Sequence, residues 1–357
     1  MSKLIVEICK IVKVEKHPNA DRLDIVTVKG WNCIVGRYNH RVGEAVVYCP
    51  PDSVIPNDLI EKYNLEYLRK NGRVGTVKLR KYISQGLILS DDCLPEGGYK
   101  EGMDVAKILG ITKYEPPVSC NLQQSGRQPT KKKRNPLFDK YTDIENIQNY
   151  NTVFKEGDIV VITEKIHGTN FRAGNLKRYK GNLLGKILGF LFGKCEFVYG
   201  SHNVQKTPMN RKMGFYGEDV YGRIAKKYNL KEIIPEDYIV YGEIFGPNIQ
   251  ELTYGMKDID VRFFDVRYNG KYLNYDEFVE FCDKRNLPRV PEIYKGGFEE
   301  RWLRLATVAN SRLDWKQIRE GCVVKAFVEE NNPQIGRKVL KSINPEYLAK
   351  KSRTDFH

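Results

Sequence analysis

Several features that would assign the chain to a familiar class are missing from this sequence. Its eight cysteines form no Cys-x-x-Cys pair and no spacing typical of a zinc site, which favours reduced and mostly buried thiols. The most apolar segment, residues 183–192, carries a lysine and is only about half as long as a membrane span. We therefore expect no membrane anchor, and we interpret residues 183–194 as a buried insertion or packing surface.

Targeting signals and internal repeats are also lacking. The opening stretch, MSKLIVEICKIVKVE, alternates like a β-strand and has neither the long apolar core nor the cleavage site of a signal peptide. No repeat of solenoid length recurs along the chain. Together with the reduced thiols, these features predict an intracellular, cytoplasmic protein.

Acidic residues are in deficit. The chain has 59 lysines and arginines against 45 aspartates and glutamates, for a net charge of +14. A surplus of this size favours a polyanionic partner, because binding phosphates releases condensed counterions. The alternative is a surface that is merely basic.

The length of 357 residues predicts two domains. Residues 1–113 contain short β-type runs separated by turn-forming residues, which is typical of a small closed barrel. Residues 114–138 are a basic linker rich in proline and glutamine. In residues 139–357, strand-like segments such as DIVVITEK and VRFFDVRY alternate with helix-like segments such as NYDEFVEFCDKRN and RWLRLATVANSRL.

Lys165 lies in TEKIHGTNFR, directly after an apolar strand-like run. A lysine amine is nucleophilic only when deprotonated, and we expect the end of a buried strand among other lysines to lower its pKa. Gly168 would let the backbone turn tightly and approach a ligand. Alone, this pattern is weak, and an exposed lysine before a turn would be the better interpretation.

Four further clusters follow in order. Glu243 lies in YGEIFG, where a carboxylate would bind a ribose or a metal, and Phe264 in VRFFDV offers a face on which a purine stacks. Glu320 precedes the apolar run GCVV and is a candidate metal ligand. Lys338 and Lys341 in RKVLKSI are cations able to bind a triphosphate.

The series KIHG, YGE, FFD, EGxVxK and a late lysine motif resembles the covalent nucleotidyltransferases, which include ATP-dependent ligases and capping enzymes. EKIHGTNF is similar to the ATP-dependent RNA ligases of the double-strand-sealing and RNA-editing branch, which have a histidine at the position of His167. DNA ligases and capping enzymes usually have an aspartate at that position. Residues 140–158 also resemble the lead-in to the nucleotide pocket of that branch.

This resemblance implies that Lys165 becomes adenylylated by ATP, that AMP passes to an RNA 5′-phosphate, and that a 3′-hydroxyl then seals the break. It implies Mg²⁺ or Mn²⁺ bound by Glu320 and Glu243, and a role for His167 after the first step. The remaining implied contacts are those of the nucleotide: Glu164, Ile166 and Gly168 around the adenine and the turn, Asn170 at the ribose, Phe264 on the base, and Lys338 and Lys341 at the phosphates.

The sequence departs from the family pattern at two places. His202 in SHN stands where the family often has a basic residue that contacts phosphate, and Lys206 or Arg211 would be substitutes. The last motif reads KVLK rather than two lysines separated by one residue, which favours Lys341 over Lys338.

The first domain resembles the OB-type barrel of tRNA-binding modules, through VEKHPNADRLDIVTVKGW and RVGEAVVYCPPDSVIP. Its HPNAD segment is expected to shape a turn. Arg73, Lys78, Arg80 and Lys81 in GRVGTVKLRKYISQG form the expected RNA-binding face, with His202 as a further RNA contact in the second domain.

Taken together, these features predict an α+β protein: an N-terminal OB-type β-barrel followed by an adenylyltransferase domain of antiparallel sheets with flanking helices. We expect a monomeric RNA ligase acting on nicked duplex or templated RNA. A DNA ligase or a GTP-using capping enzyme is the second alternative, disfavoured by His167 and by the lack of a second OB-sized segment after Lys341. A non-catalytic tRNA-binding accessory protein is the third, and it leaves the ordered motifs unexplained.

Overall fold

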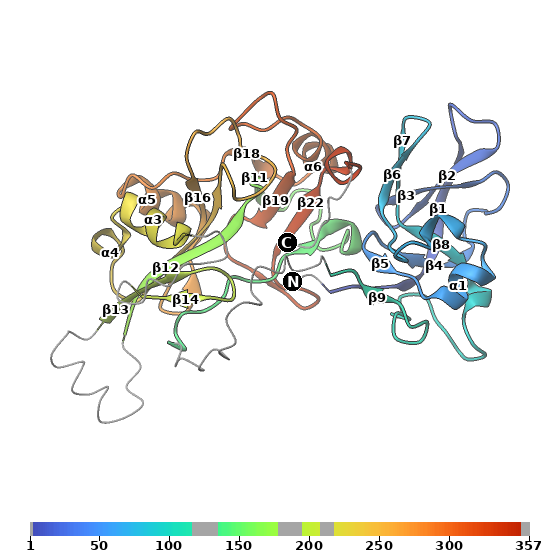
Figure 1. Cartoon of the computed structure of the whole chain (residues 1–357), viewed down its shortest axis with the longest axis horizontal. Helices are drawn as coiled ribbons and strands as arrows, with labels where there is room; N and C mark the ends of the chain where they lie inside the picture. Colours follow the sequence, from blue (N-terminus) through green and yellow to red (C-terminus); the bar gives the residue numbers. More distant parts are fainter. Residues whose placement is uncertain (1–2, 116–134, 178–194, 208–217, 351–357) are drawn as a thin grey trace. The chain divides into compact units, whose positions relative to one another are not determined.

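The computed structural model describes residues 3–115, 135–177, 195–207 and 218–350 (Figure 1). Most of the expected linker, the segment 183–194 and Arg211 lie outside the described residues. The chain forms two compact units, one of Met1–Pro117, Asp143–Lys155 and Leu340–His357, the other of Val118–Thr142 and Glu156–Val339. These units differ from the division at 113 and 138 expected from composition, which stays a prediction.

The first unit contains the expected barrel. Its main sheet has the order β3-β2-β1-β4-β8, built from β1 (Glu7–Lys16), β2 (Leu23–Val28), β3 (Trp31–Gly36), β4 (Ala45–Cys49) and β8 (Leu87–Ser90). The first half of β1 pairs with β4 and its second half with β2, with an irregularity between Ile11 and Lys13. This bend lets one long strand serve both sides of a small barrel.

Shorter elements complete the barrel: α1 (Asn57–Lys62), η1 (Glu66–Leu68), η2 (Asp91–Cys93), the pair β5 (Ser53–Val54) and β9 (Thr112–Lys113), and the hairpin β6 (Thr76–Leu79) and β7 (Tyr82–Gln85). The hairpin is tied to β3 because the Ile34 N–H donates to Ser84 Oγ (3.0 Å) and the Cys33 thiol donates to the Gln85 carbonyl (3.2 Å). Its tip consists of Arg80 and Lys81, both with positive φ (47° and 76°).

Residues outside the N-terminal third also belong to the first unit. β10 (Glu145–Asn146), followed by η3 (Ile147–Asn149), pairs in parallel with β22 (Val339–Ile343), and Asn146 lies opposite Lys341. Helix α7 (Pro345–Leu348) follows β22. Most of the strand that carries Lys341, from Leu340 onward, is thus part of the compact unit that contains the barrel.

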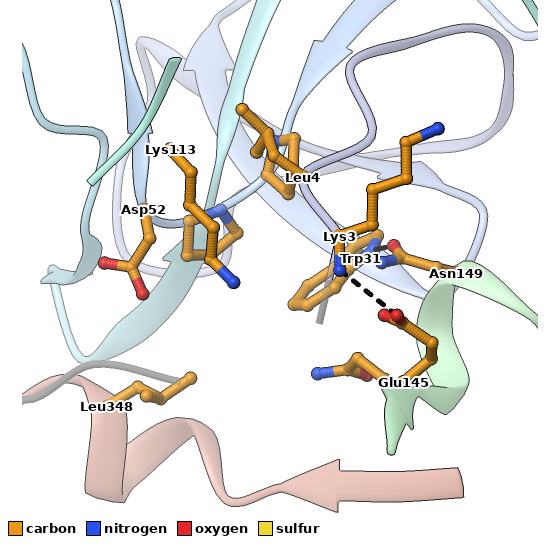
Figure 2. Close-up of a pocket in the computed structure, with 11 residues that line it drawn as sticks. Lys3, Leu4, Trp31, Asp52, Lys113, Glu145, Asn149 and Leu348 are labelled. Carbon is orange, nitrogen blue, oxygen red and sulfur yellow. Dashed lines mark hydrogen bonds between the residues drawn. The ribbon is translucent and has the colours of Figure 1, made fainter. Parts of the chain in front are cut away.

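Specific hydrogen bonds join these later residues to the barrel. The Lys3 backbone N–H donates to Glu145 Oε1 and the Trp31 indole donates to Asn149 Oδ1, each at 3.1 Å. Figure 2 shows these groups around a small pocket, which Asp52, Lys113 and Leu348 also line. The barrel is therefore anchored to the segment 145–149 by polar contacts.

The second unit contains two antiparallel sheets. In the first, β11 (Ile159–Lys165) pairs with β18 (Glu292–Gly297) on one side and β19 (Gly321–Ala326) on the other. The second has the order β14-β13-β12-β15-β16-β17, with β12 (Thr169–Lys177), β13 (Cys195–Gly200), β14 (Gln205–Lys206), β15 (Tyr238–Phe245), β16 (Asp260–Tyr268) and β17 (Lys271–Tyr272). A separate two-stranded ribbon is formed by β20 (Asn331–Asn332) and β21 (Gly336–Arg337).

Four helices accompany these sheets in the described part of the unit: α3 (Val220–Lys227), α4 (Leu230–Ile233), α5 (Tyr275–Asp283) and α6 (Glu300–Thr307). The apolar faces of α3, α4 and α5 contribute to a core that includes Phe171, Ile224, Phe263 and Phe278. No helix among the described residues is long and apolar enough to cross a membrane. The α+β fold with an N-terminal barrel is confirmed.

Candidate active site

Lys165 is the last residue of β11, and Glu320 immediately precedes the neighbouring strand β19. Strand pairing places Lys165 opposite Gly321, so the two side chains meet at one end of the sheet. Lys165 Nζ donates to Glu320 Oε1 at 2.7 Å, and both side chains are largely shielded from solvent. The amine of Lys165 is thus held by a carboxylate, whereas the sequence had suggested a setting among other lysines.

The chain turns sharply between β11 and β12 at Gly168. A Cβ at this position would lie 2.1 Å from the Ile244 carbonyl oxygen, so only glycine fits without a shift of the backbone. The turn places the buried His167 with Nδ1 3.6 Å from Glu320 Oε2. The His167 backbone N–H donates to the Tyr254 hydroxyl at 2.7 Å, which fixes the turn.

Glu243 joins this group from β15, where it lies opposite Asn170 of β12. Burial raises the pKa of Glu243 to about 8; the negative charge of Glu320 adds to the increase, and the positive charge of Lys165 opposes it. The structure thus brings Lys165, Glu243 and Glu320 within electrostatic reach of one another.

Glu164 is buried beside the loop that follows α6. Its Oε2 accepts from the Arg312 backbone N–H (2.8 Å) and lies 3.8 Å from Arg319 Nε. Burial raises the pKa of this carboxyl, although hydrogen bonds from Ser311 and Arg312 and the charge of Arg319 oppose the increase. Its Oε1 is buried and has no hydrogen-bond partner among the described residues.

Asn170 also has a buried acceptor atom. Its side-chain Oδ1 is buried without a hydrogen-bond partner in the described part of the chain. Ile166, between Lys165 and His167, is also buried. Buried acceptors that lack a partner are costly, and they indicate sites where a ligand donates.

Phe264 is positioned by a β-bulge. Tyr241 pairs with Asp265 and Gly242 with Phe263, which leaves Phe264 without a partner on β15. Phe263 packs in the core, whereas Phe264 is half-buried and meets the edge of Tyr141, with ring centroids 4.8 Å apart. A bulge of this kind re-aims a side chain away from the regular alternation.

A buried polar network lies next to Phe264. Asp265 accepts from the Tyr141 hydroxyl (2.9 Å) and pairs with Arg337 (2.7 Å) and Lys325 (3.4 Å). Burial acts to raise the pKa of Asp265, but the charges of Arg337 and Lys325 outweigh it and hold that pKa below its ordinary value. The Arg337 guanidinium also lies 3.7 Å from the centre of the Tyr272 ring.

The two lysines of the last motif have different surroundings. Lys338 Nζ donates to Asp158 (2.9 Å) and pairs with Glu330 (3.2 Å). Lys341 is buried on β22, in the unit that contains the barrel. Their expected phosphate contacts stay predictions.

The four expected RNA-binding residues of the barrel also differ in their surroundings. Arg73 pairs with Asp52 (2.7 Å) and packs over Tyr114, and Lys78 pairs with Glu346 (2.7 Å). Arg80 and Lys81 are exposed at the hairpin tip, and neither has an ion-pair partner within the described residues. These two therefore remain the most available cations of the set.

His202 lies in the turn after β13, where its carbonyl accepts from Arg172 Nη2 at 3.3 Å. Arg172 is buried, and its guanidinium also donates to the carbonyls of Ser201 (3.0 Å) and Phe138 (2.6 Å). Lys206, the expected substitute, pairs with Asp219 at 2.8 Å. The turn is thus held by Arg172, which belongs to none of the sequence motifs expected to contact RNA or phosphate.

Sequence reasoning also missed Arg312, Arg337 and Tyr254, which orient Glu164, Asp265 and the turn at His167. Arg312 acts through its backbone, which no residue pattern reveals. Arg337 has an available signal, since it lies directly before the motif lysine Lys338.

Comparison with known proteins places these features in context. A family model described as RNA ligase matches residues 158–343, and an OB-fold domain model matches residues 5–90. No curated protein matches the chain.

Solved structures of a Naegleria gruberi RNA ligase share the fold. A variant with ATP and Mn has a TM-score of 0.73 at 24% identity, covering 97% of this chain and 98% of that one. A variant with AMP and Mn has a TM-score of 0.75 at 24% identity, covering 98% and 99%. Because the RNA ligase model spans more than half of the 357 residues and includes the Lys165 cluster, the chain belongs to the RNA ligase family.

Proposed function

We propose that this protein is an ATP-dependent RNA ligase that joins 3′-hydroxyl and 5′-phosphate RNA ends through a lysyl-AMP intermediate. The observation that carries the proposal is the Lys165 amine, held 2.7 Å from Glu320 at the end of two paired strands and within the field of Glu243. Membership of the RNA ligase family supplies the reaction class.

Two buried acceptors without hydrogen-bond partners among the described residues fit an adenine nucleotide. Glu164 Oε1 suits the exocyclic amino group of adenine, and Asn170 Oδ1 suits a ribose hydroxyl, because each nucleotide group donates a hydrogen bond. Guanine has a carbonyl in place of that amino group, which would face the Glu164 carboxylate. Phe264, half-buried at the bulge, is available to stack on the base.

The carboxylates fit a divalent cation. No group of three potential metal-ligating side chains forms a ready site in the residues described, but Mg²⁺ commonly binds through one or two carboxylates together with substrate phosphates. Glu320 and Glu243 would hold Mg²⁺ or Mn²⁺; burial is the main cause of the raised pKa of Glu243, and a bound cation would favour the ionised form of this carboxyl. The ion would supply charge stabilisation at the phosphates.

In the first step, Lys165 leaves its ion pair and loses a proton, and Nζ then attacks the α-phosphorus of ATP. An N–P bond forms and the bond to pyrophosphate breaks. In the second step, an oxygen of the RNA 5′-phosphate attacks the phosphorus of AMP, the N–P bond breaks, and the lysine regains a proton. In the third step, the RNA 3′-hydroxyl oxygen attacks the phosphorus of the RNA 5′-phosphate, and AMP and a proton are released.

Four other residues have roles in this scheme. His167, buried near Glu320, serves the steps after adenylylation. Lys341 contacts the α-phosphate, and Lys338 is a second phosphate contact once it leaves Asp158. Gly168 allows the backbone to approach the nucleotide.

The barrel is the proposed grip on RNA, through Arg80 and Lys81 at the exposed hairpin tip. Its match to an OB-fold model and the net charge of +14 support this role. The substrate we propose is a nick in duplex or templated RNA, bound by a monomer inside the cell.

A sealing assay with two kinds of 5′ end tests the proposal. Wild type should seal a nicked duplex with a 5′-phosphate in the presence of ATP and Mg²⁺. Lys165→Ala should fail on this substrate but seal a nick that carries a pre-adenylylated 5′ end, because only the first step needs the amine as nucleophile.

Equal loss on both substrates would contradict a role for Lys165 as the AMP acceptor. Use of GTP in place of ATP would move the protein to the capping class. Sealing of DNA but not RNA would favour the DNA ligase alternative. Absence of any nucleotidyl transfer would favour the accessory-protein alternative.

A further inference from the structure

Trp315 is the most exposed of the three tryptophans. Its exposed fraction is 73%, whereas Trp31 is buried at 3% and hydrogen-bonded to Asn149. Trp302 is half-buried and stacks on Tyr294, with ring centroids 5.2 Å apart and an angle of 19° between the planes. Leaving a tryptophan ring in water forgoes the stabilisation that its burial would provide.

The loop that holds Trp315 is ordered by its own hydrogen bonds. The Asn310 side chain donates to the Trp315 carbonyl (2.8 Å), and the Ser311 N–H donates to the Gln317 carbonyl (2.8 Å). The Ser311 hydroxyl accepts from the Leu313 N–H at 3.0 Å. The ring is therefore presented on a braced loop, which reduces the entropy lost on binding.

Both ends of this loop reach the candidate active site. The Arg312 backbone donates to Glu164, and Arg319 lies 3.8 Å from the same carboxylate, directly before Glu320. The loop thus contacts Glu164, the neighbour of Lys165, and leads directly into Glu320, the carboxylate that pairs with Lys165. A ligand on Trp315 would lie on a segment continuous with the site.

One cation adjoins the Trp315 ring. Lys316 is exposed, and its Nζ lies 5.7 Å from the centre of that ring. An exposed aromatic face beside a cation fits a base with its attached phosphate better than it fits an apolar protein surface.

We propose that Trp315 is a stacking platform for an unpaired or terminal nucleobase of the RNA substrate, with Lys316 at the adjoining phosphate. This inference rests on the proposed RNA ligase function and adds a second RNA contact, on the catalytic unit rather than on the barrel. Base stacking on an aromatic side chain is worth about 1–3 kcal/mol. Loss of the ring should therefore weaken RNA binding by about 5- to 150-fold.

Intrinsic fluorescence tests the proposal without requiring sealing. The probe is a nicked RNA duplex with a 5′-hydroxyl at the nick, which cannot be adenylylated. We expect it to quench the tryptophan emission of wild type and of Trp302→Phe, but to leave that of Trp315→Phe unquenched. Trp315→Ala should raise the KM for a sealable nick about tenfold, while its labelling by ATP alone stays at the wild-type level.

Quenching that persists in Trp315→Phe, or a wild-type RNA KM in Trp315→Ala, would overturn the proposal. So would a concentration-dependent dimer that Trp315→Ala abolishes with no change in RNA KM, since the ring would then cover a second copy of the chain. Failure of the proposed function is distinguishable, because wild type would then take up no label from ATP whatever the fluorescence shows.

Discussion

Glu164 is the residue that we expect to determine the preference for ATP over GTP. One of its oxygens is satisfied by the Arg312 backbone, and the other is a buried orphan. The adjacent Lys165 is the proposed nucleophile, so a base held by Glu164 would be held close to the reacting bond.

Glu164→Ala should therefore raise the KM for ATP in lysine labelling. A charge-assisted hydrogen bond is worth about 1.5–3 kcal/mol, which corresponds to a rise of about 10- to 100-fold. The preference for ATP over GTP should shrink in the same variant. Glu299→Ala removes a more exposed carboxylate as a matched control; equal ATP kinetics in both variants would sink the assignment.

Asp265 leads to a prediction about pH. Its pKa is held below the ordinary value, so its stabilising effect is fully present above pH 4 and is lost as pH falls through the lowered pKa. Asp265→Asn leaves Arg337 and Lys325 without their buried partner, and it should lower the free energy of unfolding at pH 7 by about 3–5 kcal/mol.

Denaturant unfolding at several pH values checks this prediction. The difference between wild type and Asp265→Asn should be constant above pH 5 and shrink below pH 4. Asp276→Asn, which removes an exposed partner of Lys295, should change stability little at any pH. A difference that does not depend on pH would contradict the account.

Among structural elements, the turn from β11 to β12 limits the site most tightly. Gly168→Ala would place a Cβ 2.1 Å from the Ile244 carbonyl. We expect the strands to separate locally, at a cost of about 1–3 kcal/mol, and lysine labelling to fall far more than stability does. Gly297→Ala, whose nearest atoms lie at 3.6 Å, is the control; labelling at the wild-type level in Gly168→Ala would refute the close approach.

The hairpin tip is the element assigned to RNA on the barrel. Arg80→Ala with Lys81→Ala should raise the RNA KM and reduce the slope of log KM against log salt by about 1–2. Lysine labelling by ATP should be unaffected. The double variant Lys100→Ala with Lys107→Ala removes two other exposed lysines of the same unit; equal effects of the two double variants would mean that only total charge matters.

The sequence was sufficient for elements whose pattern is local. The strand β16, with its β-branched and aromatic residues, was predicted within one residue, and the core of α5 was predicted from its apolar periodicity. The strand β12 was not predicted, because TNFRAGNLK has polar residues and a glycine. It is a strand because β13 and β15 pair with it on both sides.

Other differences have equally specific causes. Helix α6 was expected to run to Leu313 but ends at Thr307, where Asn310 and Ser311 use their side chains to form a loop. The β6–β7 hairpin turns through Arg80 and Lys81 rather than through the glycine or asparagine that would have identified it. The bulge at Phe264 depends on pairing between distant strands and leaves no mark in the local sequence.

At the scale of the whole molecule, the barrel is not an independent appendage. Its compact unit includes β10, α7 and most of the strand that carries Lys341, and Lys3 and Trp31 bond to Glu145 and Asn149. Removing residues 1–113 would expose the surfaces of Glu145 and Asn149 that bond to the barrel. Point variants in the full chain therefore separate RNA binding from adenylylation more cleanly than deletion of the barrel.

The central claim is that Lys165 becomes covalently bound to AMP. Incubation of the full chain with α-labelled ATP and Mg²⁺, without RNA, followed by peptide mapping, tests it most directly. The account predicts one labelled peptide, adenylylated at Lys165 through an acid-labile bond, and none in Lys165→Ala. A label on any other residue, or a wild-type protein that takes up no label, would contradict it.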